Sequence, residues 1–140
     1  MDILIKRFRN RILDQTPLQN ILKGDLEFTD DQIEGFIIEA LYQINEAPPR
    51  RRKFRIENFP VTGLLLDGAV VFMLKARGLL HLRNQISYSD AGTSVNVDDK
   101  SGHYAQWANA FEMKYLEDLK QFKRMLVPRM RGIHSPMRWY

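Results

Sequence analysis

The part of the chain that most restricts its fold is residues 101–126, near the C-terminal end. Its apolar side chains recur every three or four residues, which is the spacing of one face of an α-helix. At 1.5 Å per residue, this helix would be well over about 30 Å long, about the width of a small domain. We therefore expect a fold built from long helices. The apolar stripe consists of Tyr104, Trp107, Ala108, Phe111, Tyr115, Leu119, Phe122 and Leu126.

The simplest interpretation of this stripe is a hydrophobic core. Two of its aromatic residues, Trp107 and Phe111, also fit a contact with a neighbouring subunit, because aromatic side chains are enriched at protein interfaces. The sequence does not separate these two interpretations.

A second long helix is predicted at residues 61–86, where apolar residues surround most of the helical cylinder. We expect this segment to be the buried central helix. Its three glycines each weaken a helix by about 1 kcal/mol relative to alanine, so they indicate compensating packing or a close approach of neighbouring backbones. Asp67 should then need an ion-pair partner, either Arg77 or an arginine of residues 50–55. The glycines are Gly63, Gly68 and Gly78.

A third helix is predicted within residues 28–49. Thr29 followed by Gln32 matches a capping box, which marks the start of a helix. Pro48 and Pro49 then end it. Its acidic first turns complement the helix dipole, so those carboxylates have a local explanation. Its apolar stripe consists of Ile33, Phe36, Ile37, Ala40, Leu41 and Ile44.

Two shorter elements are also predicted. Residues 3–13 form an amphipathic helix with Ile5, Phe8 and Ile12 on one face, suited to docking on its own bundle or on a neighbouring subunit. Residues 86–97 alternate apolar and polar side chains around "SDAGTS", which is typical of a small β-hairpin.

The chain ends in "VPRMRGIHSPMRWY", which has neither a helical nor a strand period. Such a segment cannot bury itself alone, so it is either disordered or ordered by a partner. We therefore divide the chain into a helical-bundle domain at 1–127, with the hairpin near 86–97, and an extended C-terminal arm at 128–140. A chain of 140 residues with 44% apolar and 27% charged content fits one such domain.

Charge is separated into blocks along the chain, whose net charge is +4. Residues 25–46 carry seven acidic side chains and no basic one. The basic block that follows suits head-to-tail contact between identical subunits. It also suits phosphate binding, or simply a solvated surface. Its basic residues are Arg50, Arg51, Arg52, Lys53 and Arg55.

The sequence contains no recognisable catalytic motif. The three histidines, at positions 81, 103 and 134, are far apart, and neither an H-E-x-x-H motif nor a serine elbow is present. The chain has no cysteine, which indicates assembly in a reducing compartment such as the cytoplasm. We expect no enzyme activity, no cofactor, no bound metal and no membrane contact.

The order of three sequence features carries a resemblance: an acidic helix ending "INEAPP", a glycine-containing helix running into "RNQISYSDAG", and a last helix leading to "GIHSP". In this order the chain resembles the head-to-tail connector, or adaptor (head-completion), proteins of tailed bacteriophages. The resemblance covers most of residues 28–140. In that family a simpler loop often replaces the segment "SYSDAGTSVNV" of this chain.

The resemblance implies a virion neck protein. It implies a dodecameric ring below the portal, surrounding the DNA passage, with a lower face offered to the next neck or tail protein. The basic block would contact DNA without reading sequence, or would pair with the acidic helix of the adjacent subunit. The arm would dock on the portal through Arg129, Arg131, Ile133, Arg138, Trp139 and Tyr140.

Other functions also fit the sequence. A small basic nucleic-acid-binding module and a regulatory protein remain open, as do a stopper and a tail terminator, which form rings in the same passage. The sequence does not determine the ring stoichiometry, the residues that face DNA, the role of the hairpin or the host.

Overall fold

The computed structural model describes three stretches of the chain: 1–15, 26–89 and 100–127. These stretches are mainly helical and contain no strand, which confirms the expected helical fold class. The elements are α1 (Asp2–Ile12), α2 (Asp30–Glu46), the short 3₁₀-helix η2 (Ile56–Asn58), α3 (Thr62–Ser89) and α4 (Lys100–Met125).

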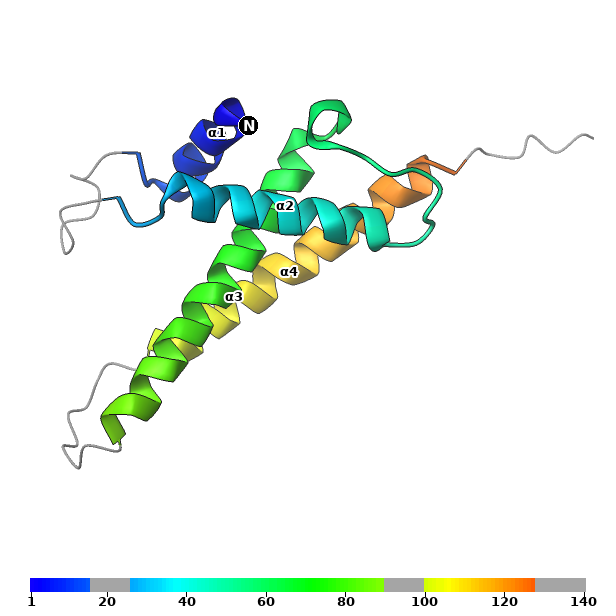
Figure 1. Ribbon diagram of the computed structural model, residues 1–140. Helices are drawn as coiled ribbons and strands as arrows, with labels where there is room; N and C mark the ends of the chain where they lie inside the picture. The colour runs from blue at the N-terminus through cyan, green and yellow to red at the C-terminus, as the bar shows by residue number, and fades with distance from the viewer. Residues whose placement is uncertain (16–25, 90–99, 128–140) are drawn as a thin grey trace, which may run out of the picture.

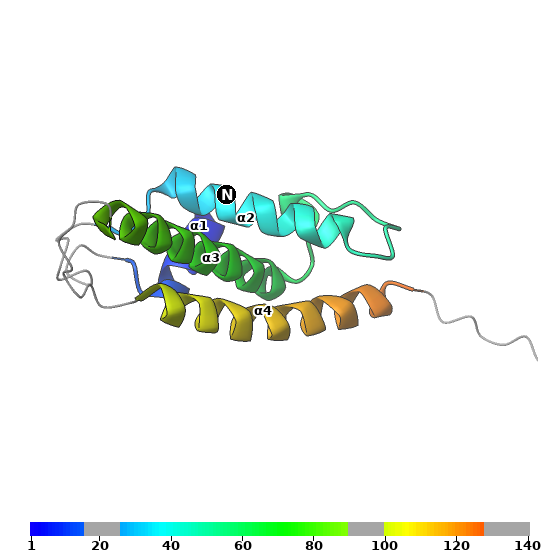
Figure 2. The ribbon, with the colours of Figure 1, turned by 90° about the horizontal axis from the view of Figure 1, so that it is seen from below.

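The helices stack in layers, with α3 between α2 and α4 (Figures 1 and 2). The helices α3 and α4 run side by side in opposite directions, and α2 crosses the upper part of this pair (Figure 1). The short helix α1 packs against α2 and α3. The lower half of the α3–α4 pair extends beyond α1 and α2 (Figure 1).

The predicted start and end of α2 are confirmed. The Thr29 hydroxyl accepts a hydrogen bond from the Gln32 backbone N–H at 3.3 Å, and the Gln32 side chain accepts one from the Thr29 N–H at 3.0 Å. This capping box satisfies two N–H groups that would otherwise lack a partner at the helix start. The helix ends at Glu46, just before Pro48 and Pro49. Its buried residues are Ile33, Ile37, Ala40, Leu41 and Ile44.

Among the side chains of α3 that the structure describes, the buried ones lie in the first half of the helix. Leu65 and Ala69 are fully buried there. Farther along, Leu79 and Leu82 expose 67% and 48% of their surface. The expectation of burial along the whole helix is therefore wrong at Leu79 and Leu82. The physical reason is that α2 covers the upper part of α3, while the lower part is left with α4 as its packing partner (Figure 1).

The β-hairpin expected at 86–97 is wrong over residues 86–89, whose backbone continues α3. Alternation over so few residues does not distinguish a strand from the end of a helix. Residues 90–97 lie outside the described residues. The C-terminal arm at 128–140, with all six predicted docking residues, also lies outside them.

Candidate assembly surfaces

The basic connector, residues 50–55, is held in place by a phenylalanine. The Phe54 backbone N–H donates to the Asn45 side-chain oxygen at 2.7 Å, and the Asn45 amide donates back to the Phe54 carbonyl at 2.9 Å. The Phe54 ring is buried and lies 5.3 Å from the ring centroid of Phe59 and 5.8 Å from that of Phe122. These contacts attach the connector to the end of α2 and to the last turns of α4.

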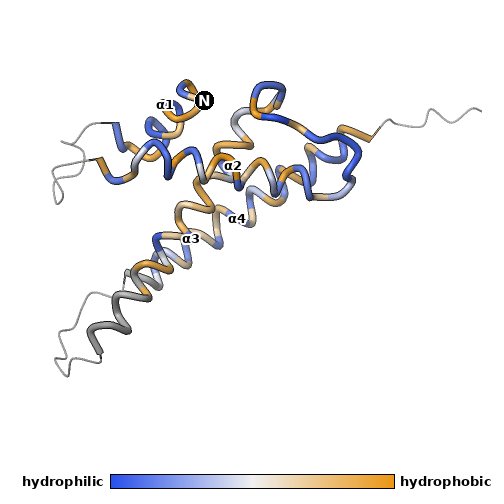
Figure 3. The backbone as a smooth tube through the Cα atoms, viewed as in Figure 1, coloured by the Kyte–Doolittle hydropathy of each residue, from blue (hydrophilic) through white to orange (hydrophobic). Residues whose placement is uncertain are grey.

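With Phe54 facing inward, the five basic residues of the connector are all exposed. Figure 3 shows the first part of this loop, residues 50–53, as a hydrophilic stretch beyond the end of α2. Arg50 is bound to Glu46 of the same chain, by an ion pair at 3.0 Å and by a hydrogen bond to the Glu46 carbonyl at 2.9 Å. Within the described residues no carboxylate pairs with the remaining four, which are Arg51, Arg52, Lys53 and Arg55.

Three carboxylates of α2 carry the opposite charge. Asp31 is exposed and Glu34 half-buried in the first turns of the helix, and Glu39 is exposed just past its middle. None of these three carboxylates has an ion-pair partner among the residues that the structure describes. A helix of this length spans about 25 Å, so an acidic surface and a basic surface lie at separate places on one subunit.

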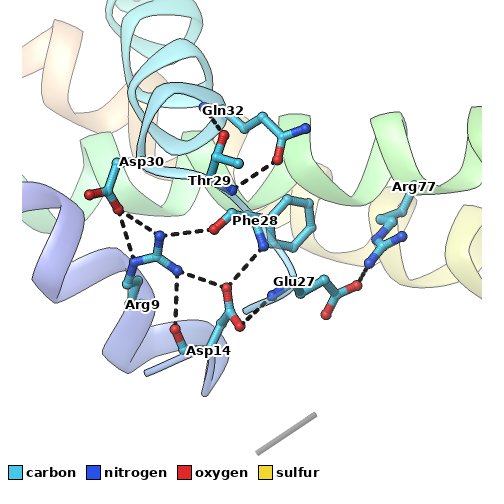
Figure 4. A network of polar contacts seen from close by, with 8 residues as sticks. All are labelled: Arg9, Asp14, Glu27, Phe28, Thr29, Asp30, Gln32 and Arg77. Carbon is cyan, nitrogen blue, oxygen red and sulfur yellow. Dashed lines mark hydrogen bonds and ion pairs between the residues drawn. The ribbon is translucent and has the colours of Figure 1, made fainter. Parts of the chain in front are cut away.

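A half-buried arginine joins α1 to the start of α2 (Figure 4). The Arg9 guanidinium donates to the Asp14 carboxylate at 2.9 Å, the Phe28 carbonyl at 2.8 Å and the Asp30 carboxylate at 2.6 Å. Asp14, itself buried, also accepts from the Glu27 backbone N–H at 2.8 Å. Since these groups satisfy one another, we assign the network a structural role. The network includes Asp30 of α2 but not Asp31.

Two further ion pairs hold the helices together. Arg11 of α1 pairs with Asp67 of α3, so the partner expected for Asp67 is corrected from Arg77 or the connector to Arg11. Arg77 instead pairs with Glu27, and its guanidinium lies 5.0 Å from the centroid of the Phe28 ring (Figure 4). The sequence missed both partners because they come from segments far apart along the chain.

The predicted stripe on α4 is divided between core and surface. Tyr115, Leu119 and Phe122 are buried, whereas Trp107 and Phe111 expose 61% and 43% of their surface. The two exposed rings stack on one another, with centroids 6.0 Å apart and planes 29° apart. We call this pair the aromatic ridge. The aromatic ridge is therefore outside the core of this chain. The sequence-based alternative, a contact with a neighbouring subunit, stays a prediction.

A groove of about 480 Å³ lies between the far halves of α3 and α4. We call it the α3–α4 groove. Sequence reasoning missed it, although small residues at helical spacing on both helices are a signal of open space or close packing. Its walls are mostly apolar or small and include Leu74, Gly78, Leu79, Leu82, Ala105 and Ala108.

Four buried side-chain polar atoms have no hydrogen-bond partner among the described residues: the Gln43 Oε1, the Arg77 Nε, the Tyr115 hydroxyl and the Lys123 ammonium. Burial lowers the pKa of Lys123, partly offset by the nearby Glu46 carboxylate. Burial also raises the pKa of Tyr115, and the Asp67 carboxylate raises it further. The burial of Lys123 leaves no local pattern in the sequence, so only the structure reveals it.

Within residues 1–15, 26–89 and 100–127, no three histidine, cysteine, aspartate or glutamate side chains gather as metal ligands would. None of the described helices combines the length and apolar content needed to cross a membrane.

Searches for similar proteins leave the chain without a counterpart: no protein-family model, no curated protein and no solved structure matches it.

Proposed function

We infer that this chain is a structural subunit of a homo-oligomeric ring, a head-to-tail connector of a tailed bacteriophage particle with no enzymatic activity. The observation that carries the proposal is the exposed basic connector, whose Arg51, Arg52, Lys53 and Arg55 have no carboxylate partner among the described residues of their own subunit. The free carboxylates of α2, at a separate place on the same subunit, supply the complementary charge.

Opposite charges at two separate places on identical subunits favour a head-to-tail contact. Such a contact closes into a ring when the rotation between subunits permits it. Each exposed ion pair contributes only about 0–1 kcal/mol, so several pairs must act together, and they set the register and partner choice more than the affinity. Four basic side chains in a short segment, without a carboxylate partner in the part of the chain that the structure describes, meet that requirement.

In the proposed particle the ring lies below the portal and surrounds the DNA passage. Residues 128–140 dock on the portal, and another face binds the next neck or tail protein. The ring is proposed as a dodecamer, assembled in the host cytoplasm and located in the virion neck. These statements rest on the sequence resemblance, and α4 supports them by leading directly into the arm.

A charge exchange tests the contact between subunits. Arg51→Glu with Arg52→Glu should weaken self-association, as should Asp31→Lys with Glu34→Lys. Combining all four changes in one chain should restore it, because each neighbouring pair then regains opposite charges. Size-exclusion chromatography with light scattering reports the mass. If the fourfold variant stays dissociated while correctly folded, the basic connector does not face α2 of a neighbour.

The arm is tested in particles. Cross-linking with mass spectrometry should detect contacts between residues 128–140 and the portal in the full-length protein. A chain ending at Val127 should fold normally but yield no complete particles. A truncated chain that still supports normal particles would contradict the docking role of the arm.

The same exposed arginines also support a second candidate function, a small basic nucleic-acid-binding or regulatory protein. A DNA-binding module loses affinity steeply with salt and depends on its basic residues. The fourfold charge exchange separates the two candidates, because it moves the positive charge to a different surface. If the fourfold variant assembles again but does not bind duplex DNA, the result favours a head-to-tail connector protein. If the chain never self-associates and the variant loses duplex binding, the result favours a nucleic-acid-binding module.

A further inference from the structure

The aromatic ridge and the α3–α4 groove lie on opposite flanks of the same pair of helices. On α4 the groove is lined by Gly102, Tyr104, Ala105, Ala108 and Asn109, and Ala105 and Asn109 form the wall farthest from the ridge. Trp107 and Phe111 each follow one of these residues by two positions, and two residues turn an α-helix through about 200°. The ridge and this wall of the groove therefore point in directions about 160° apart. A subunit cannot place its own ridge in its own groove.

We propose that the aromatic ridge of one copy of this chain inserts into the α3–α4 groove of a neighbouring copy. This inference rests on the proposed function, since it names an apolar contact between successive subunits of the ring. A ridge and a groove on opposite flanks form a head-to-tail contact, which leaves one free ridge and one free groove at the ends of any open chain. Contacts of this kind generate rings when they close.

The lining of the groove suits an apolar occupant. Among the described residues, the one charged residue that lines it is Lys75, whose ammonium is bound to the Glu112 carboxylate at 2.6 Å. This ion pair neutralises the charge at the groove. Gly78, Ala105 and Ala108 have small side chains, which leave the space open.

The volume of the groove suits two aromatic side chains. Each aromatic side chain can bury about 150–250 Å² on insertion. A space of about 480 Å³ is in the size range of pockets that enclose groups of this size. The stacked arrangement of Trp107 and Phe111 is already formed in the single subunit, so little ordering is needed when they insert.

The ridge by itself is too small to make a stable interface. A standard interface buries about 800 Å² on each partner, more than two partly exposed rings supply. We therefore expect the ridge to act as the central anchor of a larger contact that also includes the charged surfaces. Anchors of this kind are most often tryptophan, tyrosine or arginine.

Removal of the ridge tests the proposal. Trp107→Ala with Phe111→Ala should weaken self-association of the full chain at least about tenfold, measured by sedimentation or light scattering across concentrations. The control is Met113→Ala, which removes an exposed apolar side chain that lines neither feature and should change nothing. Circular dichroism checks that each variant keeps its helices.

Filling of the groove provides the second variant. Ala105→Phe should weaken self-association to a similar degree, whereas the control Ala110→Phe, at an exposed position outside the groove, should not. Mixing the ridge-less variant with the filled-groove variant then gives the decisive result. The mixture should form dimers and stop there, because only one ridge and one groove remain able to meet.

The results separate this inference from the proposed function. A variant without the ridge that self-associates as the wild-type chain does overturns the inference but leaves the ring proposal standing. A wild-type chain that is monomeric at every concentration, alone and in particles, overturns both. If Ala105→Phe leaves self-association unchanged but abolishes binding of an apolar fluorescent dye, the groove serves another molecule and the inference is wrong.

Discussion

Gly68 of α3 lies directly against the Tyr115 ring of α4. A Cβ atom added at Gly68 would lie 2.8 Å from the Tyr115 Cζ atom and 2.9 Å from its hydroxyl oxygen. Both distances are too short for non-bonded contact. The absence of a side chain at Gly68 therefore sets how closely α3 and α4 approach, and Tyr115 is buried in the space that the glycine leaves.

We expect Gly68→Ala to lower the free energy of unfolding by about 1–3 kcal/mol, because the buried ring cannot move away without disturbing the core. The control is Gly35→Ala on α2, where nothing lies within 4 Å of an added Cβ. That change should raise the free energy of unfolding by about 0.5–1 kcal/mol through helix propensity. Chemical denaturation measures both, and equal effects at the two positions would contradict the close contact.

Alkaline titration should distinguish Tyr115 from the other tyrosines. Burial and then Asp67 raise the pKa of Tyr115 above its ordinary value near 10. As pH rises past 10, the unfolded chain loses this proton while the folded chain keeps it. The free energy of unfolding is therefore unaffected below about pH 10 and decreases above it. Tyrosinate absorbance should show one late-titrating group that disappears in Tyr115→Phe but persists in Tyr42→Phe.

Replacement of Lys123 by methionine should stabilise the fold. Lys123 is only 2% exposed and its ammonium has no hydrogen-bond partner among the described residues. We expect Lys123→Met to raise the free energy of unfolding at neutral pH by about 1–3 kcal/mol. The matched control, Lys120→Met, changes an exposed lysine of the same helix and should have little effect.

The pH dependence gives a second check on Lys123. Because burial lowers its pKa, the unfolded chain binds more protons than the folded chain between the folded pKa and about 10.4. In that window the contribution of Lys123 to the free energy of unfolding rises with pH. The rise should be absent from Lys123→Met, and its persistence there would assign it to another group.

Loss of the buried Asp14 carboxylate should strongly lower the free energy of unfolding. Its carboxylate binds Arg9 and the backbone N–H groups of Glu27 and Phe28. Asp14→Ala would leave buried donors without partners, which lowers the free energy of unfolding by about 2–5 kcal/mol. Asp31→Ala, at an exposed site, should lower it by less than about 1 kcal/mol. Thermal unfolding compares the two, and similar losses would refute the structural role of the network.

Local patterns predicted the helices well. The capping box of Thr29 and Gln32 and the prolines after α2 act within a few residues, so sequence spacing alone shows them. The stripe on α4 likewise follows from a period of 3.6 residues. The end of α3 was misjudged at residues 86–89, because two alternating residues carry too little information to distinguish a strand from a helix end.

The candidate surfaces were predicted only in part. The charge of the basic connector is visible in the sequence, but its exposure depends on Phe54, which the Asn45 side chain and the rings of Phe59 and Phe122 hold inward. The α3–α4 groove has no local signature, since residues of two separate helices form it.

By itself, then, the sequence determined the helical class, the start and end of α2 and the blocks of opposite charge, because each depends on neighbours a few positions away. Only the tertiary structure decided that Trp107 and Phe111 are exposed, that Lys123 is buried and that Arg11 is the partner of Asp67. These features depend on how far α2 covers the α3–α4 pair and where α1 docks. That coverage is set by packing between segments distant in sequence, which no local period encodes.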